Sequence, residues 1–522
     1  MKNIILLGFA LFALASCSNF LEDYSQDEAK VENIADLDEL LIGSVYYKPG
    51  CVYFKGSSSE QIGEPFLACI HFMSDELKQN EDRYGHYEML SGTEEMFGYY
   101  TWQKWVGMDF KGTRISKEGT DWTKAYKYIN VANMILDEVE DIKVDRSREE
   151  NDKLRVEGET RFLRALYYFL LVNLYAEPYV PATAATTAGV PLKLTAYIED
   201  KEYTSATLEE VYAQILEDLG RAEECLKQCE RKSVYRADYA TTLLLKSRVY
   251  LYMQDYAKAK EYAGKVIERN ASLTDLHGYA AGTANVYSAE SPEVLFSMGG
   301  HFLSNYMYGD FDPRYEDQTP FFVSDELAEA FSDDNDLRKS LYVVEGEYGY
   351  FYKKIYWDIN TQKAPSKISD HFLFRVSEAY LNLAEAAALD DDEATARDIL
   401  GKLQAKRYNT MPAINESGSD LIDLIRAERR RELCLEGHRW FDLRRYMVCE
   451  KHKSQMKITH TYTDYELSGY RWTATRVRVF ELDPENNPQD FKAYTLAFPK
   501  EVLDFQNTLG RNERPDRLPI NN

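Results

Sequence analysis

Apolar residues recur every three or four positions along several long stretches of this chain, and most of these stretches adjoin another of the same kind. This spacing places apolar side chains on one face of a helix, so adjacent stretches predict helical hairpins that must pack on further helices. The sequence therefore predicts a mostly α fold, a tetratricopeptide-like helical-repeat scaffold. The expected helices cover residues 37–46, 122–139, 162–174, 208–226, 239–253, 256–267, 372–389, 394–403 and 421–435.

The helical periodicity lapses in two places, between residues 46 and 122 and over residues 270–369. Within the second, short runs at residues 294–297 and 350–357 predict strands. A segment of this length is too long for a plain loop, and irregular segments on a repeat scaffold are where binding residues usually lie. We expect an N-terminal helical region over residues 35–269 and a C-terminal region over residues 270–522 that contains the insertion.

The first residues predict an export signal. Lys2 precedes a short apolar run from Ile4 to Leu14, and small residues then lead to Cys17. The run is too short to cross a bilayer, and its arrangement is typical of a bacterial lipoprotein signal. We expect residues 1–16 to be removed, Cys17 to carry a lipid, and residues 17–34 to form a tether. The alternative is ordinary cleavage after Ala15, which would leave a soluble secreted chain.

Composition excludes several classes of protein. The chain has 62 Lys and Arg against 87 Asp and Glu, a net charge of -25 that would repel nucleic acid. Only six cysteines remain besides Cys17, without a C-x-x-C pair, so neither a disulfide scaffold nor a cysteine metal site is expected. Aromatic residues make up 13% of the chain and include 40 tyrosines, whose rigid rings with a hydroxyl at the edge suit amphipathic ligands such as sugars.

The common catalytic motifs are absent from the sequence. It contains no H-E-x-x-H, phosphate-binding loop, G-x-G-x-x-G or G-x-S-x-G motif. The acidic clusters at residues 333–336 and 390–393 lack the glycine and distal glutamate of an EF-hand loop, so no metal and no cofactor are expected. We expect a binding protein rather than an enzyme, with a carboxylate pair for glycoside hydrolysis as the alternative.

The densest charge pattern covers residues 426–444. Continuing the apolar face of this helix places Arg429, Glu432 and Glu436 on or beside its buried side. Buried charges must be paired, so we expect these residues, together with Arg439, to form a structural ion-pair lattice that ties the helix to its neighbours. The alternative is an anion or sugar site.

The chain resembles the SusD/RagB family of Bacteroidetes outer-membrane lipoproteins. Motifs similar to those of the family occur in order at residues 73–76, 158–169, 189–192, 208–222, 375–386 and 428–444. The resemblance implies about four tetratricopeptide units and a lipid-anchored outer-membrane protein exposed on the cell surface. Such a protein binds an oligosaccharide or polysaccharide without catalysis and forms a lid on a SusC-like TonB-dependent transporter.

The resemblance also points to binding residues in the irregular segments, where sugar rings would pack on aromatic side chains. The glycan-binding candidates are Asp75, Arg83, Tyr100, Trp102, Trp105, Tyr306, Tyr308 and Trp357. A structural role for Asp75 is an alternative, and packing is an alternative for each aromatic residue. Two other functions stay open: a peptide receptor of RagB type, and a tetratricopeptide scaffold that binds a partner protein without a small ligand.

Overall fold

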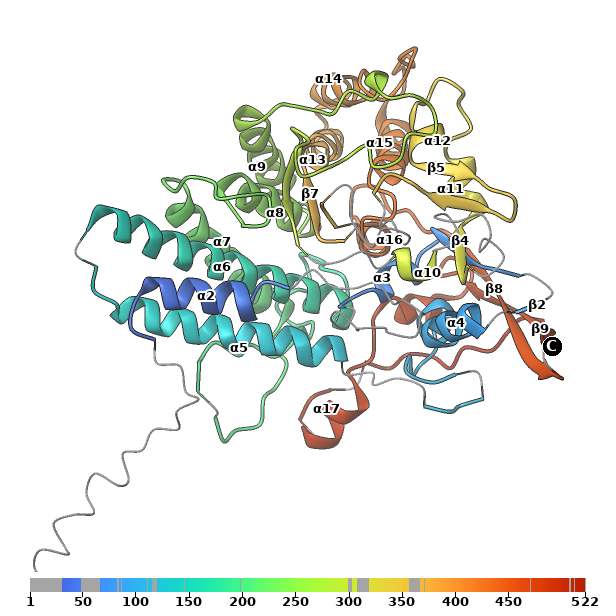
Figure 1. Ribbon diagram of the computed structural model, residues 1–522, viewed down its shortest axis with the longest axis horizontal. Helices are drawn as coiled ribbons and strands as arrows, with labels where there is room; N and C mark the ends of the chain where they lie inside the picture. Colours follow the sequence, from blue (N-terminus) through green and yellow to red (C-terminus); the bar gives the residue numbers. More distant parts are fainter. Residues whose placement is uncertain are drawn as a thin grey trace, which may run out of the picture.

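The structure is a computed structural model in which a long stack of helices carries small sheets and loops at one end (Figure 1). It describes residues 31–47, 66–81, 84–85, 87–109, 111–114, 120–144, 146–197, 199–298, 303–307, 319–355, 367–369, 371–469, 471–506, 508–510 and 512–521.

Each helix of the stack packs against the next one along the chain. The stack consists of α5 (Thr120–Asp141), α6 (Ser147–Tyr175), α7 (Leu208–Leu226), α8 (Tyr239–Tyr252), α9 (Tyr256–Arg269), α13 (Val376–Leu389) and α14 (Glu393–Gln404). Two further helices, α2 (Ile34–Ser44) and α15 (Gly418–Glu432), cover its sides. The prediction of a mostly helical repeat scaffold with small irregular elaborations is confirmed.

Local sequence signals set the starts of these helices. Thr207 and Glu210 form a reciprocal capping box at the start of α7. The side chains of Asp238, Asp255 and Asp392 accept backbone N–H groups at the starts of α8, α9 and α14. The acidic cluster at residues 390–393 thus includes the cap of a helix.

The helix α6 lies at the centre of the stack and is buried on every side from Val156 onward apart from a few half-buried positions. At Gly158 an added Cβ would come within 2.7 Å of the side chain of Leu226 on α7. Glycine at this position therefore lets α6 and α7 approach closely. This requirement explains the glycine at the start of the conspicuous sequence motif over residues 158–169.

The stack is continuous in space although it is interrupted in sequence. Helix α9 packs directly against α13, while the residues between them leave the stack as the predicted insertion. The described part of the insertion contains β3 (Val294–Ser297), which matches its prediction, and the short elements η1 (Leu276–Gly278), α10 (Leu303–Tyr306), β4 (Phe321–Val323), α11 (Asp325–Glu329), α12 (Arg338–Leu341), β5 (Val343–Glu345) and β6 (Tyr350–Tyr352).

Two small antiparallel sheets bind the insertion to the rest of the chain. In the first, with strand order β1-β4-β6-β5, β1 (Leu77–Gln79) pairs with β4 through the register Leu77↔Val323. In the second, β3 pairs with β7 (Leu373–Arg375), the strand that leads into α13. The pairings β1–β4 and β3–β7 join segments far apart in sequence, so no local pattern predicts them.

A long hairpin of β8 (Ile458–Ser468) and β9 (Arg471–Leu482) projects from the sheet end of the molecule (Figure 1). The short strand β2 (Tyr84–Gly85) pairs with one end of β9. Further along the same edge, the N–H of Ile520 donates to the carbonyl of Val479. The side-chain amide of Asn521 accepts from the N–H of Val479 and donates to the carbonyl of Val477. The C-terminal tail thus covers an edge that would otherwise be open to pairing.

Some expectations for the elements were wrong. The segment between residues 46 and 122 contains the helix α4 (Tyr87–Tyr100) as well as α3 (Cys69–Phe72), and α16 (Arg439–Val448) and the β8–β9 hairpin were not predicted. Residues 372–375 lie outside α13, because β7 precedes it. The sequence of α4 includes Gly92 and Gly98, which weaken its helical pattern and explain why periodicity missed this helix.

One buried apolar cluster extends from Ile34 to Leu509 and includes residues of both predicted regions. Within the described ranges, no helix combines the length and the apolar character needed to cross a membrane. The remaining elements, η4 (Pro488–Tyr494) and α17 (Lys500–Phe505), follow the hairpin.

Candidate functional site

The turn after α3 fastens the first irregular segment to the charged helices. Asp75 receives a bidentate contact from Arg439, with Nε–Oδ1 and Nη2–Oδ2 distances of 2.7 and 2.9 Å, and lies 2.7 Å from a terminal nitrogen of Arg430. Burial alone would raise the pKa of Asp75, but these guanidinium groups hold it well below its usual range. Asp75 is therefore paired with two guanidinium groups in the interior. This geometry fits a structural role for Asp75, the alternative to glycan binding.

Glu76, the next residue, is buried beside Asp75 and accepts the backbone N–H of Leu435 at 3.0 Å. Burial, and then the negative charge of Asp75, raise the pKa of Glu76 to about 7. The motif Ser74-Asp75-Glu76 thus contacts the junction between α15 and α16 through two buried carboxyl groups, one with a lowered and one with a raised pKa. Two family-like motifs, far apart in sequence, meet at this contact.

Replacing Glu76 with glutamine should remove a pH-dependent loss of stability. Because the folded pKa lies above the ordinary value of 4.5, the carboxyl stabilises the fold below about pH 4.5 and loses this contribution as the pH rises through about 7. The shift corresponds to at most about 3 kcal/mol. Urea unfolding at pH 5 to 8 should show Glu76→Gln gaining stability relative to the wild type as the pH rises. A constant difference across this range would contradict the prediction.

Three aromatic rings stack beside this turn. His460 of β8 lies between Tyr100 and Trp102, with ring centroids 4.0 and 4.5 Å away and interplanar angles of 8° and 19°. Its two ring nitrogens lie 2.6 and 3.0 Å from the carbonyl oxygens of Tyr100 and Ser74. The indole N–H of Trp102 donates to the carbonyl of Met73 at 2.9 Å. The stack joins α4, β8 and the turn into one unit.

Several glycan-binding candidates therefore need correction. Trp102 has 0% of its surface exposed, and Tyr100 and Asp75 are also buried, so none of the three presents a free face to a ligand. Tyr306 packs edge-on against Phe72 at 4.7 Å and is buried as well. These side chains belong to the core. The sequence pattern did not reveal their burial, because their partners lie on elements far apart in the chain.

Trp105 is the aromatic candidate in the described residues that keeps partial exposure. It lies in the loop between α4 and α5, which begins with a Schellman turn: Trp102 has a φ of 53°, and the N–H of Gln103 donates to the carbonyl of Gly98 at 2.8 Å. The loop then folds back so closely that a Cβ on Gly98 would lie 2.2 Å from the carbonyl oxygen of Val106. A side chain at position 98 would push this loop away from α4, so the observed position of Trp105 requires the glycine.

This loop and the last turn of α4 present a run of half-exposed side chains, which we call the Trp105 surface: Tyr99, Gln103, Lys104, Trp105, Met108 and Asp109. The amide of Gln103 is oriented by donation to the hydroxyl of Thr101 at 3.0 Å, and its backbone carbonyl accepts a guanidinium N–H of the buried Arg514. An aromatic ring, an amide and an ammonium group on an anchored loop are chemically suited to a polyhydroxylated ligand. The remaining candidates, Cys17, Arg83, Tyr308 and Trp357, lie outside the described residues.

The charged segment around α15 forms a buried lattice of ion pairs. Glu432 lies at its centre, 2.8 Å from Arg407, 2.9 Å from Arg375 and 3.2 Å from Arg338. Glu436 pairs with Arg375 and Lys354. Five carboxylates are balanced by five cations in this lattice, namely Glu293, Asp336, Glu428, Glu432 and Glu436 with Arg338, Lys354, Arg375, Arg407 and Arg431.

The lattice joins the insertion to the helical stack. Arg338 and Lys354 come from the insertion, whereas Glu432 and Glu436 come from α15 and the turn after it. Burial alone would raise the pKa of Glu432, but the surrounding guanidinium groups hold it well below its usual range. Each charge of the lattice is paired with opposite charges of the same lattice. Within the described residues the lattice therefore offers no open anion or sugar site.

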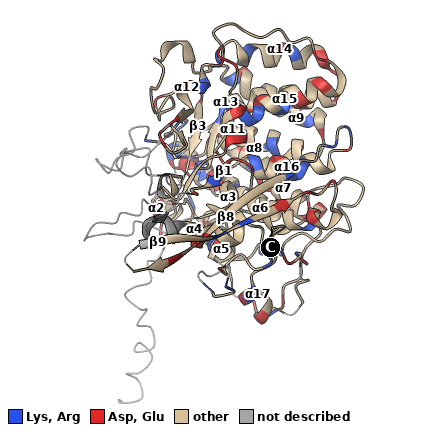
Figure 2. Cartoon of the chain, turned by 90° about the vertical axis from the view of Figure 1, so that its right-hand side faces the viewer, with Lys and Arg blue, Asp and Glu red and all other residues tan. Residues whose placement is uncertain are grey.

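The other two residues of the charged motif lie in separate networks. Arg429 contacts Asp442 at 2.8 Å and donates to Asn382 at 2.7 Å, within a network that includes Glu385 and Arg445. Arg439 holds Asp75, as described above. Figure 2 shows basic and acidic stretches close together on α14, α15 and α16. The motif is thus distributed among three groups of partners rather than directed at one ligand.

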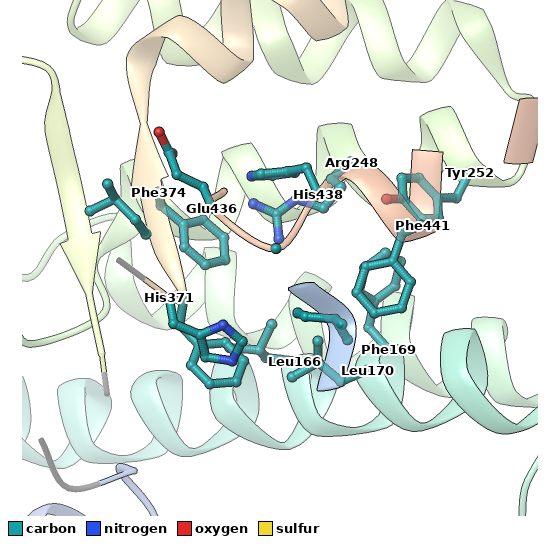
Figure 3. Close-up of a pocket in the computed structure, with 14 residues that line it drawn as sticks. Leu166, Phe169, Leu170, Arg248, Tyr252, His371, Phe374, Glu436, His438 and Phe441 are labelled. Carbon is teal, nitrogen blue, oxygen red and sulfur yellow. The ribbon is translucent and has the colours of Figure 1, made fainter. Parts of the chain in front are cut away.

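A small cavity lies between α6 and the α15–α16 junction (Figure 3). Its floor is made by Leu166, Phe169 and Leu170, and the polar side chains of Arg248 and His438 face them. Its volume of about 30 Å³ has room for about one water molecule, which excludes a sugar ring. Among the described residues, no group of three or more His, Cys, Asp or Glu is placed to hold a metal ion.

Comparison with known proteins decides the family. A family model described as "SusD family" matches residues 307–513, and a second, described as "Starch-binding associating with outer membrane", matches residues 68–251. The chain belongs to the SusD family. The resemblance seen in the motifs is confirmed, and the matched ranges include the Ser74-Asp75-Glu76 turn and all residues of the charged lattice except Glu293.

Individual relatives match this SusD family chain over different shares of its length. A SusD-like protein of Formosa agariphila is 22% identical over 86% of this chain and 90% of its own. The starch-binding protein SusD of Bacteroides thetaiotaomicron is 29% identical, over 29% of this chain and 25% of its own. The crystal structure of a SusD-like carbohydrate binding protein from Bacteroides vulgatus has a TM-score of 0.64, is 21% identical, and matches 93% of this chain and 99% of its own.

Sequence reasoning missed His460 and Gly98, which hold the Trp105 surface in place. A lone histidine in an alternating run and a glycine in an unrecognised helix carry no distinctive signal. The basic partners of Glu432 were missed for a related reason, since Arg338, Arg375 and Arg407 are scattered over about seventy residues of sequence.

Proposed function

We propose that this SusD family chain is a glycan-binding protein of the outer membrane that captures an oligosaccharide or polysaccharide and passes it to a SusC-like TonB-dependent transporter, on which it acts as a lid. The observation that carries the proposal is the match of residues 68–251 to the model of starch-binding proteins associated with the outer membrane. The protein binds and does not catalyse, in agreement with the absence of the common catalytic motifs from its sequence.

The anchor in this proposal is a lipid on Cys17, followed by a short tether to α2. A lipid-anchored chain of this acidity would not adhere to anionic lipids through its own surface, so the lipid alone would hold it at the membrane. Metabolic labelling with a fatty-acid probe should mark the wild type but not Cys17→Ala, and protease treatment of intact cells would report which side of the membrane it faces.

The binding surface in this proposal is the Trp105 surface. A sugar ring packs its C–H groups on an aromatic face while its hydroxyl groups bond to polar neighbours, and this loop offers both on a backbone that is already ordered. The buried stack of Tyr100, His460 and Trp102 supports the loop from below.

Trp105→Ala should lower glycan affinity about tenfold or more, because stacking of an aromatic ring contributes on the order of 1–3 kcal/mol. Isothermal titration of the lipid-free protein against a panel of oligosaccharides would measure this loss. Unfolding in urea should change little, since Trp105 is only half-buried. If the wild type bound no glycan of the panel and retained peptides instead, the proposed ligand class would be wrong.

A further inference from the structure

A second aromatic surface lies on the outer side of α5, away from the buried core. Tyr197 has 69% of its surface exposed, and Leu194 and Met134 beside it are each 41% exposed. The hydroxyl of Tyr197 donates to Asp137 of α5 at 3.0 Å. We call Met134, Leu194 and Tyr197 the Tyr197 surface.

The backbone beneath this surface is held from several sides. The ammonium group of Lys193 donates to the carbonyls of Thr195 and Tyr197, each at 2.6 Å. The buried side chain of Asn133 donates to the carbonyls of Lys193 and Thr195 at 2.9 and 3.2 Å. The ring of Tyr197 is therefore fixed at both its backbone and its hydroxyl, although most of its surface faces solvent. A ring that is already ordered loses little entropy when a ligand packs on it.

The charge around the ring is negative. Asp137, Glu138 and Asp141 are exposed on the same side of α5 and raise the pKa of the Tyr197 hydroxyl above its ordinary value, first through the hydrogen bond from Tyr197 to Asp137 and then through their charges. Carboxylates beside an aromatic ring accept hydrogen bonds from sugar hydroxyl groups, but they repel uronic acids and sulfated sugars.

The short helix α17 and the residues after it contact the segments that carry the two surfaces. Arg114, which follows the loop of Trp105, forms an ion pair with Glu501 of α17, and the hydroxyl of Thr508 donates to the carbonyl of Tyr203 at 3.1 Å. Phe505 at the end of α17 has 86% of its surface exposed. In Figure 1, α17 lies at the lower side of the molecule, where these contacts place it between the two loops.

We propose that the Tyr197 surface is a second carbohydrate-binding site, which holds a neutral sugar chain. The inference rests on the proposed function and adds to it that the ligand is a polymer long enough to engage two separate sites. Two weak sites on one chain raise the apparent affinity for a polymer without changing the affinity of either site for a short ligand.

The test compares a polymer with its short fragments. Affinity electrophoresis in amylopectin, mannan, arabinoxylan and polygalacturonate would find the polymer that the wild type binds, and titration with its di- to tetrasaccharides would report binding at single sites without the gain from engaging two. Tyr197→Ala should lower affinity for the polymer about tenfold and change affinity for the fragments less than twofold. Trp105→Ala should retain weak binding of the polymer, which Trp105→Ala combined with Tyr197→Ala should abolish.

Tyr235 provides the matched control. It is 47% exposed, lies in the segment between α7 and α8, and its hydroxyl donates to the carbonyl of Lys367 at 2.7 Å rather than to a carboxylate. Tyr235→Ala should bind the polymer as the wild type does. Equal binding by Tyr197→Ala and the wild type, or binding of polygalacturonate alone, would overturn the inference and leave the proposed function standing. If the wild type bound neither a polymer nor a fragment, both the inference and the proposed function would be wrong.

Discussion

Replacing Glu432 with glutamine should lower the free energy of unfolding by about 3–5 kcal/mol, because it leaves buried cations without their shared counterion. Glutamine keeps the size and hydrogen-bonding oxygen of the side chain, so the loss reports charge rather than a cavity. The carboxylate touches Arg338, Arg375 and Arg407, all of which are fully buried. No other single side chain in the lattice contacts as many of its cations through ion pairs, so this position is the most sensitive one to test.

Urea unfolding at pH 7 would measure the loss, and Glu261→Gln is the matched control. Glu261 pairs with Lys258 and Lys265 on the exposed side of α9, where an ion pair contributes at most about 1 kcal/mol. The pKa of Glu432 is held below its ordinary value of 4.5, so the wild type should lose its advantage over Glu432→Gln as the pH falls below about 4.5. A loss no larger than that of Glu261→Gln at pH 7 would show that the lattice does not stabilise the fold.

Replacing Trp102 with alanine should cost about 3–5 kcal/mol of stability, as expected for a large buried aromatic side chain. The change removes the stack on His460 and the hydrogen bond to Met73, and the left-handed backbone at this position then lacks the packing that offsets its strain. Because the same residue begins the loop of Trp105, glycan affinity should fall together with stability.

The comparison with Trp105→Ala separates the roles of the two tryptophans. Trp102→Ala should lower the urea midpoint strongly, whereas Trp105→Ala should lower glycan affinity at an almost unchanged midpoint. Trp102→Phe should recover much of the stability and the affinity, since it restores a ring on His460. If Trp102→Ala bound no glycan but unfolded like the wild type, the indole would contact the ligand and our assignment of it to the core would be wrong.

The helices of the stack could be predicted from sequence because their signals are local. Helix α7 was predicted with its observed ends, and α5, α8, α9 and α14 within a few residues, since capping residues and apolar faces lie within each segment. The helix α4 was missed because Gly92 and Gly98 weaken its helical pattern, and the β8–β9 hairpin was missed although its two strands are adjacent in sequence and pair with each other.

The candidate site was predicted less well than the fold. The aromatic cluster at residues 99–105 was found, but the sequence could not tell the buried Trp102 from the half-exposed Trp105. That distinction depends on the left-handed turn at Trp102 and on the ring of His460, which is 358 positions further along the chain. The Tyr197 surface had no signal at all, since exposure of a tyrosine is a property of the folded surface.

The sequence by itself determined that this chain is a helical-repeat protein, that it has an insertion within the repeats, that it belongs to the SusD family and that the charges of residues 426–444 need partners. These properties follow from local periodicity and from motifs that lie within single segments. Only the tertiary structure decided which partners the charges have and which aromatic rings stay at the surface. Both depend on contacts between segments hundreds of residues apart, such as Asp75 with Arg439, which no local pattern records.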